Sequence, residues 1–491
     1  MPIALLRCAA VFLIALSCRA AELDRKLDAL IEAGVPAGMG FAGVQVVELT
    51  GGKTLYRHNE SQLFLPASNM KLLTSGLALS RLGADYRYTT RVVRETSGDV
   101  VIVASGDPTL SGRSFPYQKD SPMGPPLGII EDLADQAVAH GLREVNGDVV
   151  GDDRLYPWVP YPPSWTQDDE TEDFGAPVSA LTITESFLTL TAKPGSHPGD
   201  LASLSIVPDL EYYAIDNRIL TVTRGQEGKI HMQRLPGSRQ ILLWGSIPAG
   251  AAGLSISTAI DDPALYAADA FYDALTRRGV IIRGRPLARH RTPSEVIASS
   301  GAEATSSAIP EDVIGSHTSP PLRDLLQTMN KVSQNLYAEL ILREVGRVAR
   351  QAGTREAGLA ELGTYVGEIG GAAKDLHAED GSGLSRNTLV TPRILTKVLT
   401  HMYDSPDRDL FISLLPVGGE DGTLSTRLCC VSEGRGVRAK TGSLARALAL
   451  SGYADSKTYG RVAFSILVND FGARPSEVRQ WIDKIATALL D

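Results

Sequence analysis

Residues 63–74 read Leu-Phe-Leu-Pro-Ala-Ser-Asn-Met-Lys-Leu-Leu-Thr, so that Ser68 precedes Lys71 by three positions. Apolar residues recur at helical spacing from Met70 onward, and Gly83 stands where the helix should end. Because residues i and i+3 share one helix face, the lysine amine can approach the serine hydroxyl. A serine needs a base to attack a carbonyl, and desolvation on an apolar helix lowers the pKa of a lysine. The stretch therefore predicts a nucleophile and its base where a buried helix begins.

This pair alone does not establish catalysis. A Ser-x-x-Lys match is expected about once by chance in a chain of this length, and most such matches lie on solvated helix surfaces. The meaning of the pair depends on what else the chain contains.

Two further short motifs follow along the chain. Ser333-Gln334-Asn335 lies between segments expected to be helices, residues 321–330 and 335–346, and Lys440-Thr441-Gly442 heads a segment that can form an edge strand. Ser385-Arg386-Asn387 also fits Ser-x-Asn, but it lies in a glycine-rich loop, so we prefer Ser333. The ordered set of three motifs carries more weight than any single match.

Composition limits the class of protein. At 491 residues the chain should hold more than one domain, and its net charge of −9 argues against a nucleic-acid binder, which usually presents a basic face. The adjacent Cys429 and Cys430 imply no disulfide framework, because neighbouring cysteines rarely bridge without strain. No cluster of residues at metal-ligand spacing is visible. We therefore expect no metal and no cofactor.

The first 20 residues differ from the rest of the chain. A short charged start around Arg7 precedes an apolar run, which ends in Cys18-Arg19-Ala20. The apolar run is too short to span a bilayer and reads as a secretory signal peptide, residues 1–20, removed near Ala20. We expect export to the periplasm. Residues 15–18 also weakly resemble a lipoprotein box, which leaves lipidation at Cys18 as an alternative.

Hydrophobic patterning divides the mature chain. Residues 22–85 and 286–491 combine strands and helices and carry all three motifs, whereas residues 86–285 form a separate α+β insertion. Within the insertion, residues from about 182 to 257 are nearly all strand and turn. Residues 286–317 read as a connecting loop or a strand-loop return.

On these residues the chain resembles the low-molecular-mass class C penicillin-binding proteins, a family of D-alanyl-D-alanine carboxypeptidases and endopeptidases. Class A β-lactamases share the three motifs. The likeness covers nearly the whole mature chain, and long insertions are typical of the family. It extends to these segments: Pro66–Lys71, Gly106–Leu110, Phe174–Ala180, Asp380–Arg386, Gly422–Leu424 and Lys440–Ser443. Gln334 departs from the Asp found in shorter relatives.

The resemblance implies a fold. It is an α+β, β-lactamase/transpeptidase-like domain, with an antiparallel sheet carrying helices on both faces and a large nested insertion. The terminal helices would cover one face of the sheet, and the Ser68 helix would lie on the other.

The resemblance also implies roles for the motif residues. Ser68 would attack the carbonyl between two D-alanines, with Lys71 as its base and Ser333 relaying a proton to the leaving amine. Asn335 would orient Lys71 or the substrate amide. Four residues would bind substrate, either through the terminal carboxylate or, with the Ser68 amide, in an oxyanion hole: Lys440, Thr441, Gly442 and Ser443.

Partners follow from the same resemblance. They are peptidoglycan stem peptides, with β-lactam antibiotics as covalent inhibitors, and a homodimer is left open. In the family, an Asp five residues before the aromatic of the Gly-Ala-Pro segment contacts the amino-bearing residue of the stem peptide. Asp169 and Phe174 fit that spacing.

Each motif also has a structural interpretation. Ser333 and Asn335 could cap the following helix, and Lys440 could be a charge that protects a strand edge. The acidic run at residues 168–173 could be a solvated loop, and residues 380–386 a turn beside the site. Two other functions stay open: a β-lactamase, which normally lacks such insertions, and a non-catalytic peptidoglycan-binding protein.

Overall fold

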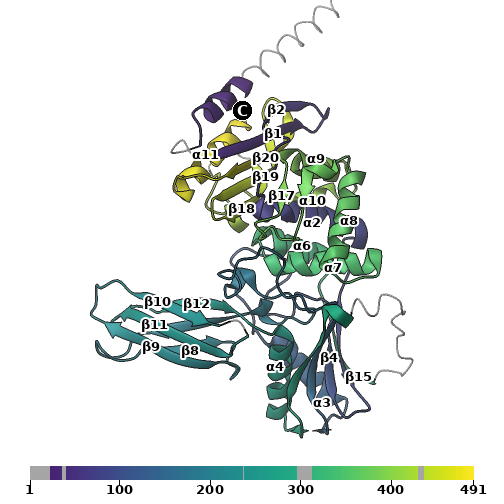
Figure 1. Ribbon diagram of the computed structural model, residues 1–491, viewed down its shortest axis with the longest axis vertical. Coiled ribbons are helices and arrows are strands. Elements are labelled where there is room, and N and C mark those ends of the chain that lie inside the picture. The colour runs from purple at the N-terminus through teal and green to yellow at the C-terminus, as the bar shows by residue number, and fades with distance from the viewer. Residues whose placement is uncertain (1–22, 36–39, 236, 296–311, 430–435) are drawn as a thin grey trace, which may run out of the picture.

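The computed structural model describes residues 23–35, 40–235, 237–295, 312–429 and 436–491 (Figure 1). The predicted signal peptide, Cys18 and Cys430 lie outside these residues. The chain forms two bodies, one above the other in Figure 1. We call residues 23–88 and 319–491 the main domain and residues 89–318 the inserted domain.

A five-stranded antiparallel sheet organises the main domain, in the order β18-β19-β20-β1-β2. Its strands are β1 (Phe41–Glu48), β2 (Thr54–His58), β18 (Val437–Leu444), β19 (Ala447–Ser456) and β20 (Gly460–Asn469). β19 and β20 are buried along almost their whole length because helices cover both faces. The sheet therefore joins segments more than 350 residues apart in sequence.

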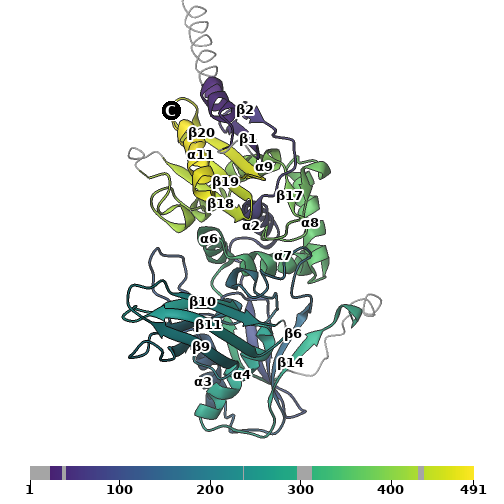
Figure 2. The same cartoon turned by 60° about the vertical axis from the view of Figure 1, so that its left-hand side comes forward.

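One face of this sheet packs against helix α11 (Pro475–Ala488) and the helical residues 23–32, which share a core with it (Figure 2). On the other face lie α9 (Pro392–Asp404) and α2 (Met70–Leu82), within a second core. This arrangement confirms the predicted fold class. Gly83 ends α2 as expected, with φ +82°.

The remaining helices of the main domain pack around α2. They are α6 (Leu322–Lys331), α7 (Asn335–Arg350), α8 (Arg355–Glu368) and α10 (Arg408–Leu414), with the 3-10 turns η2 (Ala67–Asn69), η5 (Ala373–Asp375) and η6 (Gly422–Leu424). A short pair, β16 (Leu376–His377) and β17 (Leu389–Val390), closes the loop between α8 and α9. The apolar residues of α2 thus lie at the centre of the main domain.

The inserted domain has its own mixed five-stranded sheet, in the order β14-β6-β4-β3-β15. Its elements are β3 (Thr89–Arg94), β4 (Val100–Val103), α3 (Gly128–Ala139), β5 (Glu144–Val145), β6 (Val149–Pro157), α4 (Pro263–Arg277), β13 (Ile281–Ile282), β14 (Pro286–Arg291) and β15 (Asp312–Thr318). Helices α3 and α4 bury their apolar sides in one core with this sheet.

The predicted boundary at residues 285 and 286 is wrong. β14 pairs in parallel with β6, and β15 pairs antiparallel with β3, so both strands belong to the inserted domain. The strand signal in the sequence is weak here, because β14 is half-buried along its whole length and β15 shows little alternation of buried and exposed residues. The chain returns to the main domain only near residue 319.

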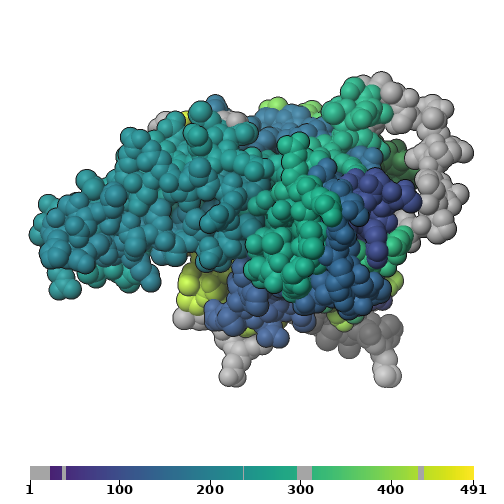
Figure 3. All heavy atoms as spheres, turned by 90° about the horizontal axis from the view of Figure 1, so that it is seen from below, coloured from purple at the N-terminus to yellow at the C-terminus, as the bar shows by residue number. Residues whose placement is uncertain are grey.

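Within the inserted domain, residues 187–259 form a nested part of two three-stranded sheets, β12-β7-β8 and β10-β11-β9, packed face to face. Its strands are β7 (Phe187–Lys193), β8 (Ser203–Val207), β9 (Ala214–Val222), β10 (Lys229–Arg234), β11 (Gln240–Pro248) and β12 (Leu254–Ala259). The space-filling view shows it extending as an arm from the rest of the molecule (Figure 3). No helix of the described residues is long and apolar enough to cross a membrane.

Candidate active site

Ser68 lies in the single turn η2, directly before α2, and its side chain is partly exposed. Two glycines allow the chain to approach this turn closely. A Cβ on Gly383 would lie 1.9 Å from the Ala67 carbonyl oxygen, and one on Gly442 would lie 2.6 Å from the Pro66 carbonyl oxygen. The nucleophile therefore sits where the 380–386 loop and strand β18 converge.

Lys71 is fully buried, and its amine faces three oxygens. Nζ lies 2.9 Å from Ser68 Oγ, 2.6 Å from Asn335 Oδ1 and 2.9 Å from the Ser382 carbonyl oxygen. Burial lowers the pKa of Lys71 to about 7, although the carboxylates of Asp380 and Glu339 oppose this shift. A neutral amine keeps two N–H groups for the amide and carbonyl oxygens, which leaves its lone pair facing Ser68.

Asn335 opens helix α7, and its side chain links the two domains. Oδ1 accepts from Lys71, and Nδ2 donates to the Phe174 carbonyl oxygen at 2.8 Å. The amide is thus fixed in one orientation by partners of opposite kind. Helix capping, the alternative interpretation of this motif, is performed by Gln334, whose Oε1 accepts from the Leu336 amide at 3.1 Å.

Ser333 adopts a left-handed backbone, with φ +65°, and its hydroxyl accepts from Lys440 Nζ at 2.8 Å. Lys440 is fully buried and also donates to the Thr441 carbonyl oxygen at 2.9 Å. Burial and the nearby charge of Lys71 hold the pKa of Lys440 well below its usual value. Since a buried lysine cannot serve as a solvated charge at a strand edge, the structure contradicts that alternative.

Strand β18 brings the remaining motif residues to the site as the outer strand of the sheet. Thr441 Oγ1 donates to Thr423 Oγ1 at 2.7 Å, which gives the 422–424 segment a place beside the site. Ser443 follows Gly442 on this strand and is exposed. Buried Asn69 holds β18 against the start of α2. Its amide nitrogen can donate to the Lys440 carbonyl oxygen at 2.8 Å while its amide oxygen accepts from Ser451.

Asp169 and Phe174 lie in the inserted domain near the same site. Asp169 is buried and pairs with Arg386, with Nη1–Oδ2 and Nη2–Oδ1 distances of 2.7 and 3.2 Å. The structure therefore does not leave Asp169 in a solvated loop. The Phe174 ring is 43% exposed, and its backbone carbonyl holds Asn335.

The sequence interpretation placed the 380–386 loop beside the site as a turn but did not foresee its contact with Lys71. Asp380 is fully buried and accepts hydrogen bonds from several groups around it: the Gly383 and Ser385 amides, the Ser382 and Thr388 hydroxyls, and the Trp165 indole. Glu339 accepts from the Gly381 and Ser382 amides, both at 2.9 Å. These two carboxylates aim the Ser382 carbonyl at Lys71. The signal available in the sequence was the close spacing of glycines and serines within residues 380–386, which is typical of a tightly packed loop.

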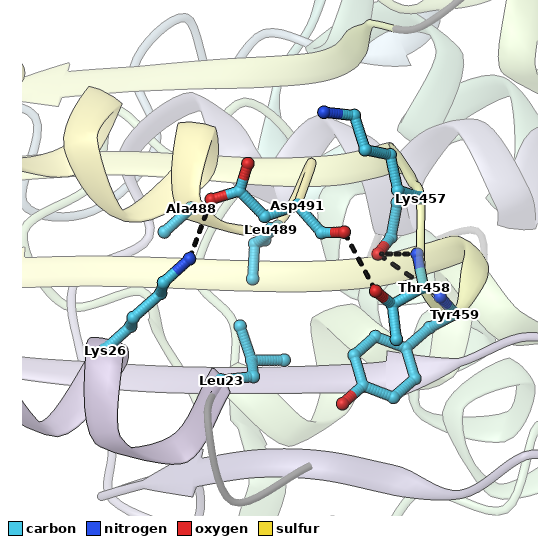
Figure 4. Close-up of a pocket in the computed structure, with 9 residues that line it drawn as sticks. Leu23, Lys26, Lys457, Thr458, Tyr459, Ala488, Leu489 and Asp491 are labelled. Atoms are coloured by element: carbon cyan, nitrogen blue, oxygen red, sulfur yellow. Dashed lines mark hydrogen bonds and ion pairs between the residues drawn. The ribbon is translucent and has the colours of Figure 1, made fainter. Parts of the chain in front are cut away.

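The three motifs thus meet Asp169 and Phe174 of the inserted domain at one site. The elements that carry these residues are α2 with its preceding turn, α7 with its preceding turn, β18 and the loops of the inserted domain. Another surface pocket, of about 350 Å³, lies between the helix of residues 23–32 and the end of α11 (Figure 4). None of the predicted site residues lines it, and we assign it no part in the chemistry. Within the described ranges no group of His, Cys, Asp and Glu side chains could hold a metal ion.

Comparison with known proteins places this geometry in context. Residues 23–489 match the model of the D-Ala-D-Ala carboxypeptidase 3 (S13) family. A D-alanyl-D-alanine carboxypeptidase of Actinomadura sp. (strain R39) is 31% identical, over 100% of this chain and 88% of the relative. D-alanyl-D-alanine carboxypeptidase DacB of Haemophilus influenzae is 22% identical, over 84% of this chain and 82% of its own.

Solved structures agree on the fold. The crystal structure of penicillin binding protein 4 (dacB) from H. influenzae matches with a TM-score of 0.78 at 21% identity, covering 96% of this chain and 99% of that one. A second structure of that protein, complexed with a novel β-lactam, matches with a TM-score of 0.74 at 20% identity over the same shares. None of the comparisons supports the homodimer left open by the sequence. The motif order, the site and the match along almost the whole chain lead to one conclusion: this chain belongs to the D-Ala-D-Ala carboxypeptidase 3 (S13) family.

Proposed function

We propose that this protein is a serine-type D-alanyl-D-alanine carboxypeptidase and endopeptidase that acts on peptidoglycan stem peptides through an acyl-enzyme on Ser68. The observation that carries the proposal is Lys71, whose pKa is lowered to about 7 and whose amine lies 2.9 Å from Ser68 Oγ. A non-catalytic binding protein would not require a buried, desolvated lysine beside a partly exposed serine.

Acylation begins at Ser68. Its Oγ attacks the carbonyl carbon of the bond between two D-alanines while Lys71 takes the hydroxyl proton. Collapse of the tetrahedral intermediate breaks the C–N bond, and the leaving amine needs a proton. Ser333, whose hydroxyl accepts from Lys440 Nζ at 2.8 Å, passes to this nitrogen the proton that Lys71 took from Ser68, which returns Lys71 to its neutral form. Water then hydrolyses the ester, with Lys71 again as the base.

Substrate binding relies on β18. Lys440 and the Thr441 hydroxyl recognise the terminal carboxylate. The backbone N–H groups of Ser68 and Ser443 form the oxyanion hole, where one donor typically contributes about 3 kcal/mol to transition-state stabilisation. Asn335 orients Lys71 and the substrate amide.

The stem peptide extends from Ser68 toward the inserted domain. Asp169 receives the amino group of the diamino acid, in competition with its present partner Arg386. The exposed Phe174 ring packs against the apolar part of the same side chain. We also propose export to the periplasm, where this polymer lies, because residues 1–20 have the pattern of a signal peptide; cell fractionation tests this.

The experiment that tests the proposal is digestion of purified peptidoglycan, with the released fragments identified by mass spectrometry. Free D-alanine marks carboxypeptidase activity and severed cross-links mark endopeptidase activity. Absence of both from wild-type digests would contradict the proposal.

A β-lactam separates this function from that of a β-lactamase. Its amine stays tethered after ring opening and obstructs the water that must hydrolyse the ester. A stoichiometric burst of ring opening followed by slow turnover supports the peptidase, whereas rapid sustained hydrolysis supports a β-lactamase.

A further inference from the structure

The turn Ser333-Gln334-Asn335 is held from the inserted domain. Gln334 Nε2 donates to Glu185 Oε2 at 2.9 Å, and Tyr337, one helical turn further on, donates its hydroxyl to Glu185 Oε1 at 3.2 Å. Ser333 needs such support because its left-handed backbone, φ +65°, is unfavourable for a residue other than glycine.

Glu185 is itself fixed with all its acceptor positions in use. Its side chain is 1% exposed, and Arg113 binds both carboxylate oxygens through Nε and Nη2, the latter at 2.8 Å. The carboxylate thus accepts from Arg113, Gln334 and Tyr337 together. Such a satisfied buried network specifies one geometry, and removing one member leaves the others unpaired.

The backbone around Glu185 is strained. Thr184, Glu185 and Ser186 have φ values of +53°, +57° and +58°, and three consecutive left-handed residues without glycine are costly in L-peptides. Strain of this kind persists only where the surroundings enforce it, and it accumulates at functional sites. It points the Glu185 side chain toward the turn before α7.

Two segments of the inserted domain support this backbone. The Thr184 amide donates to the Leu110 carbonyl at 2.9 Å, and the Gly106 amide donates to the Ala180 carbonyl at 3.0 Å. The segments Gly106–Leu110 and Phe174–Ala180 therefore form the frame of the Glu185 turn. Neither segment contributes a reacting side chain.

The identity of residue 334 fits this arrangement. A glutamine offers both an N–H for Glu185 and an oxygen for the Leu336 amide. An Asp, as in the shorter relatives, could only accept, and it would set a second negative charge against Glu185. Gln334 thus serves Glu185 and the Leu336 amide at once.

From these contacts we propose that Glu185 is a positioning residue that holds the Ser333-Gln334-Asn335 turn in its reactive geometry, so that the inserted domain is part of the catalytic machinery. Glu185 acts through Gln334 and touches no reacting atom. The proposal rests on the proposed function only for the roles of Ser333 and Asn335.

The test compares four variants with the wild-type protein. Glu185→Gln and Gln334→Glu each disrupt the amide–carboxylate contact, and the double variant restores it with reversed polarity. Gln334→Met removes both the donor to Glu185 and the acceptor of the Leu336 amide. Glu344→Gln is the control, because Glu344 is equally buried on α7 and bonds Arg347 and Tyr156 away from the turn.

The first readout is the rate at which a fluorescent penicillin acylates Ser68. We expect each single change at 185 or 334 to slow acylation about ten- to a hundredfold. The double variant should recover only part of that loss, because Arg113 still lacks one carboxylate oxygen, and the control should stay within about threefold of wild type. Equal losses in Glu344→Gln, or wild-type rates in both Glu185→Gln and Gln334→Met, would overturn the proposal.

Hydrogen exchange of residues 331–337, followed by mass spectrometry, gives a readout independent of activity. Exchange should quicken in Glu185→Gln and in Gln334→Glu, which keeps an acceptor for the Leu336 amide, and stay unchanged in the control. If wild-type protein is not acylated, the proposed function fails while hydrogen exchange still decides the role of Glu185. If exchange stays unchanged in both of the variants expected to quicken it, the positioning role of Glu185 is contradicted, whatever the acylation rates are. Should Glu185→Gln not fold, Gln334→Glu decides, because it breaks the contact with Glu185 and keeps an acceptor for the Leu336 amide.

Discussion

At the scale of single residues, the site depends on two lysines that the fold has removed from water. Lys71 and Lys440 are both fully buried, and desolvation is the largest cause of the lowered pKa of each. A free lysine has a pKa near 10.4, so in water it would hold its proton at neutral pH. Burial thus makes Lys71 a base near neutral pH, whereas buried Lys440 keeps its charge only beside an anion, which the terminal carboxylate of a substrate would supply.

The nucleophile is tested by Ser68→Ala. We expect release of D-alanine to fall by about three orders of magnitude or more, with the fold intact because a methyl group in a partly exposed turn disturbs little packing. Fluorescent penicillin should label wild type and not the variant. Turnover above a small fraction of the wild-type rate would show that another nucleophile acts.

The lowered pKa of Lys71 predicts a pH profile. Only the neutral amine accepts the Ser68 proton, so acylation should be slow below pH 6, rise through about pH 7 and level off above it. Stopped-flow acylation by a β-lactam between pH 5.5 and 9.5 measures this. A rate that is still rising at pH 9.5, with no plateau, would mean that Lys71 titrates like a solvated lysine.

Lys440→Ala tests the carboxylate anchor. The change should slow cleavage of peptides with a free terminal carboxylate about ten- to a hundredfold, because their anion loses its charged partner. Amidated peptides should be affected much less, so the two substrates become similar. An undiminished preference for the free acid would contradict this role.

At the scale of elements, the site is an assembly of close backbone approaches. Gly383 and Gly442 let the 380–386 loop and β18 pack against the Ser68 turn, where any side chain would meet backbone atoms. Backbone cannot move aside as a flexible side chain can. The spacing between the Ser68 turn and the 380–386 loop therefore sets the distance from Lys71 Nζ to the Ser382 carbonyl oxygen.

Gly383→Ala tests this spacing. Its Cβ would clash with the Ala67 carbonyl and its φ of +81° would be strained, so we expect a large loss of acylation and destabilisation of about 1–3 kcal/mol. Gly460→Ala is the control, because Gly460 has φ +67° but no atom within 4 Å. Acylation rates and thermal melts check both. Equal effects would show that backbone strain, not the clash, decides.

At the scale of the whole molecule, ion pairs tie the inserted domain together. His290 of β14 lies between Asp153 of β6 and Asp262 at the start of α4, at 2.9 and 3.2 Å. The hydrogen bonds and charges of these carboxylates raise the pKa of His290 to about 10, against its burial. The strand that the sequence placed outside the domain is thus held in it by a charged side chain.

This cluster predicts how stability depends on pH. The folded pKa is raised above the unfolded value of about 6.5, so the contribution of His290 is complete below pH 6.5 and is lost as pH rises toward 10. His290→Gln should lower the unfolding midpoint by about 2–8 °C at pH 6 and by much less at pH 10. Calorimetry at both values checks this. A pH-independent difference would show that the ring acts by packing alone.

The sequence by itself determined the local chemistry of this protein. The three-residue spacing of Ser68 and Lys71 fixes one helix face, the order of the motifs indicates the family, and apolar runs predict β19, β20 and α2. These features depend on neighbours in the chain, where backbone geometry is regular.

Only the tertiary structure decided which distant groups meet. The Ser382 carbonyl reaches Lys71, Asp169 meets Arg386, and Glu185 supports the turn at Gln334, across 311, 217 and 149 residues. The return of β14 and β15 to the inserted sheet is equally long-range. Such contacts follow from strand register and from the packing of whole elements, which no short window of residues encodes.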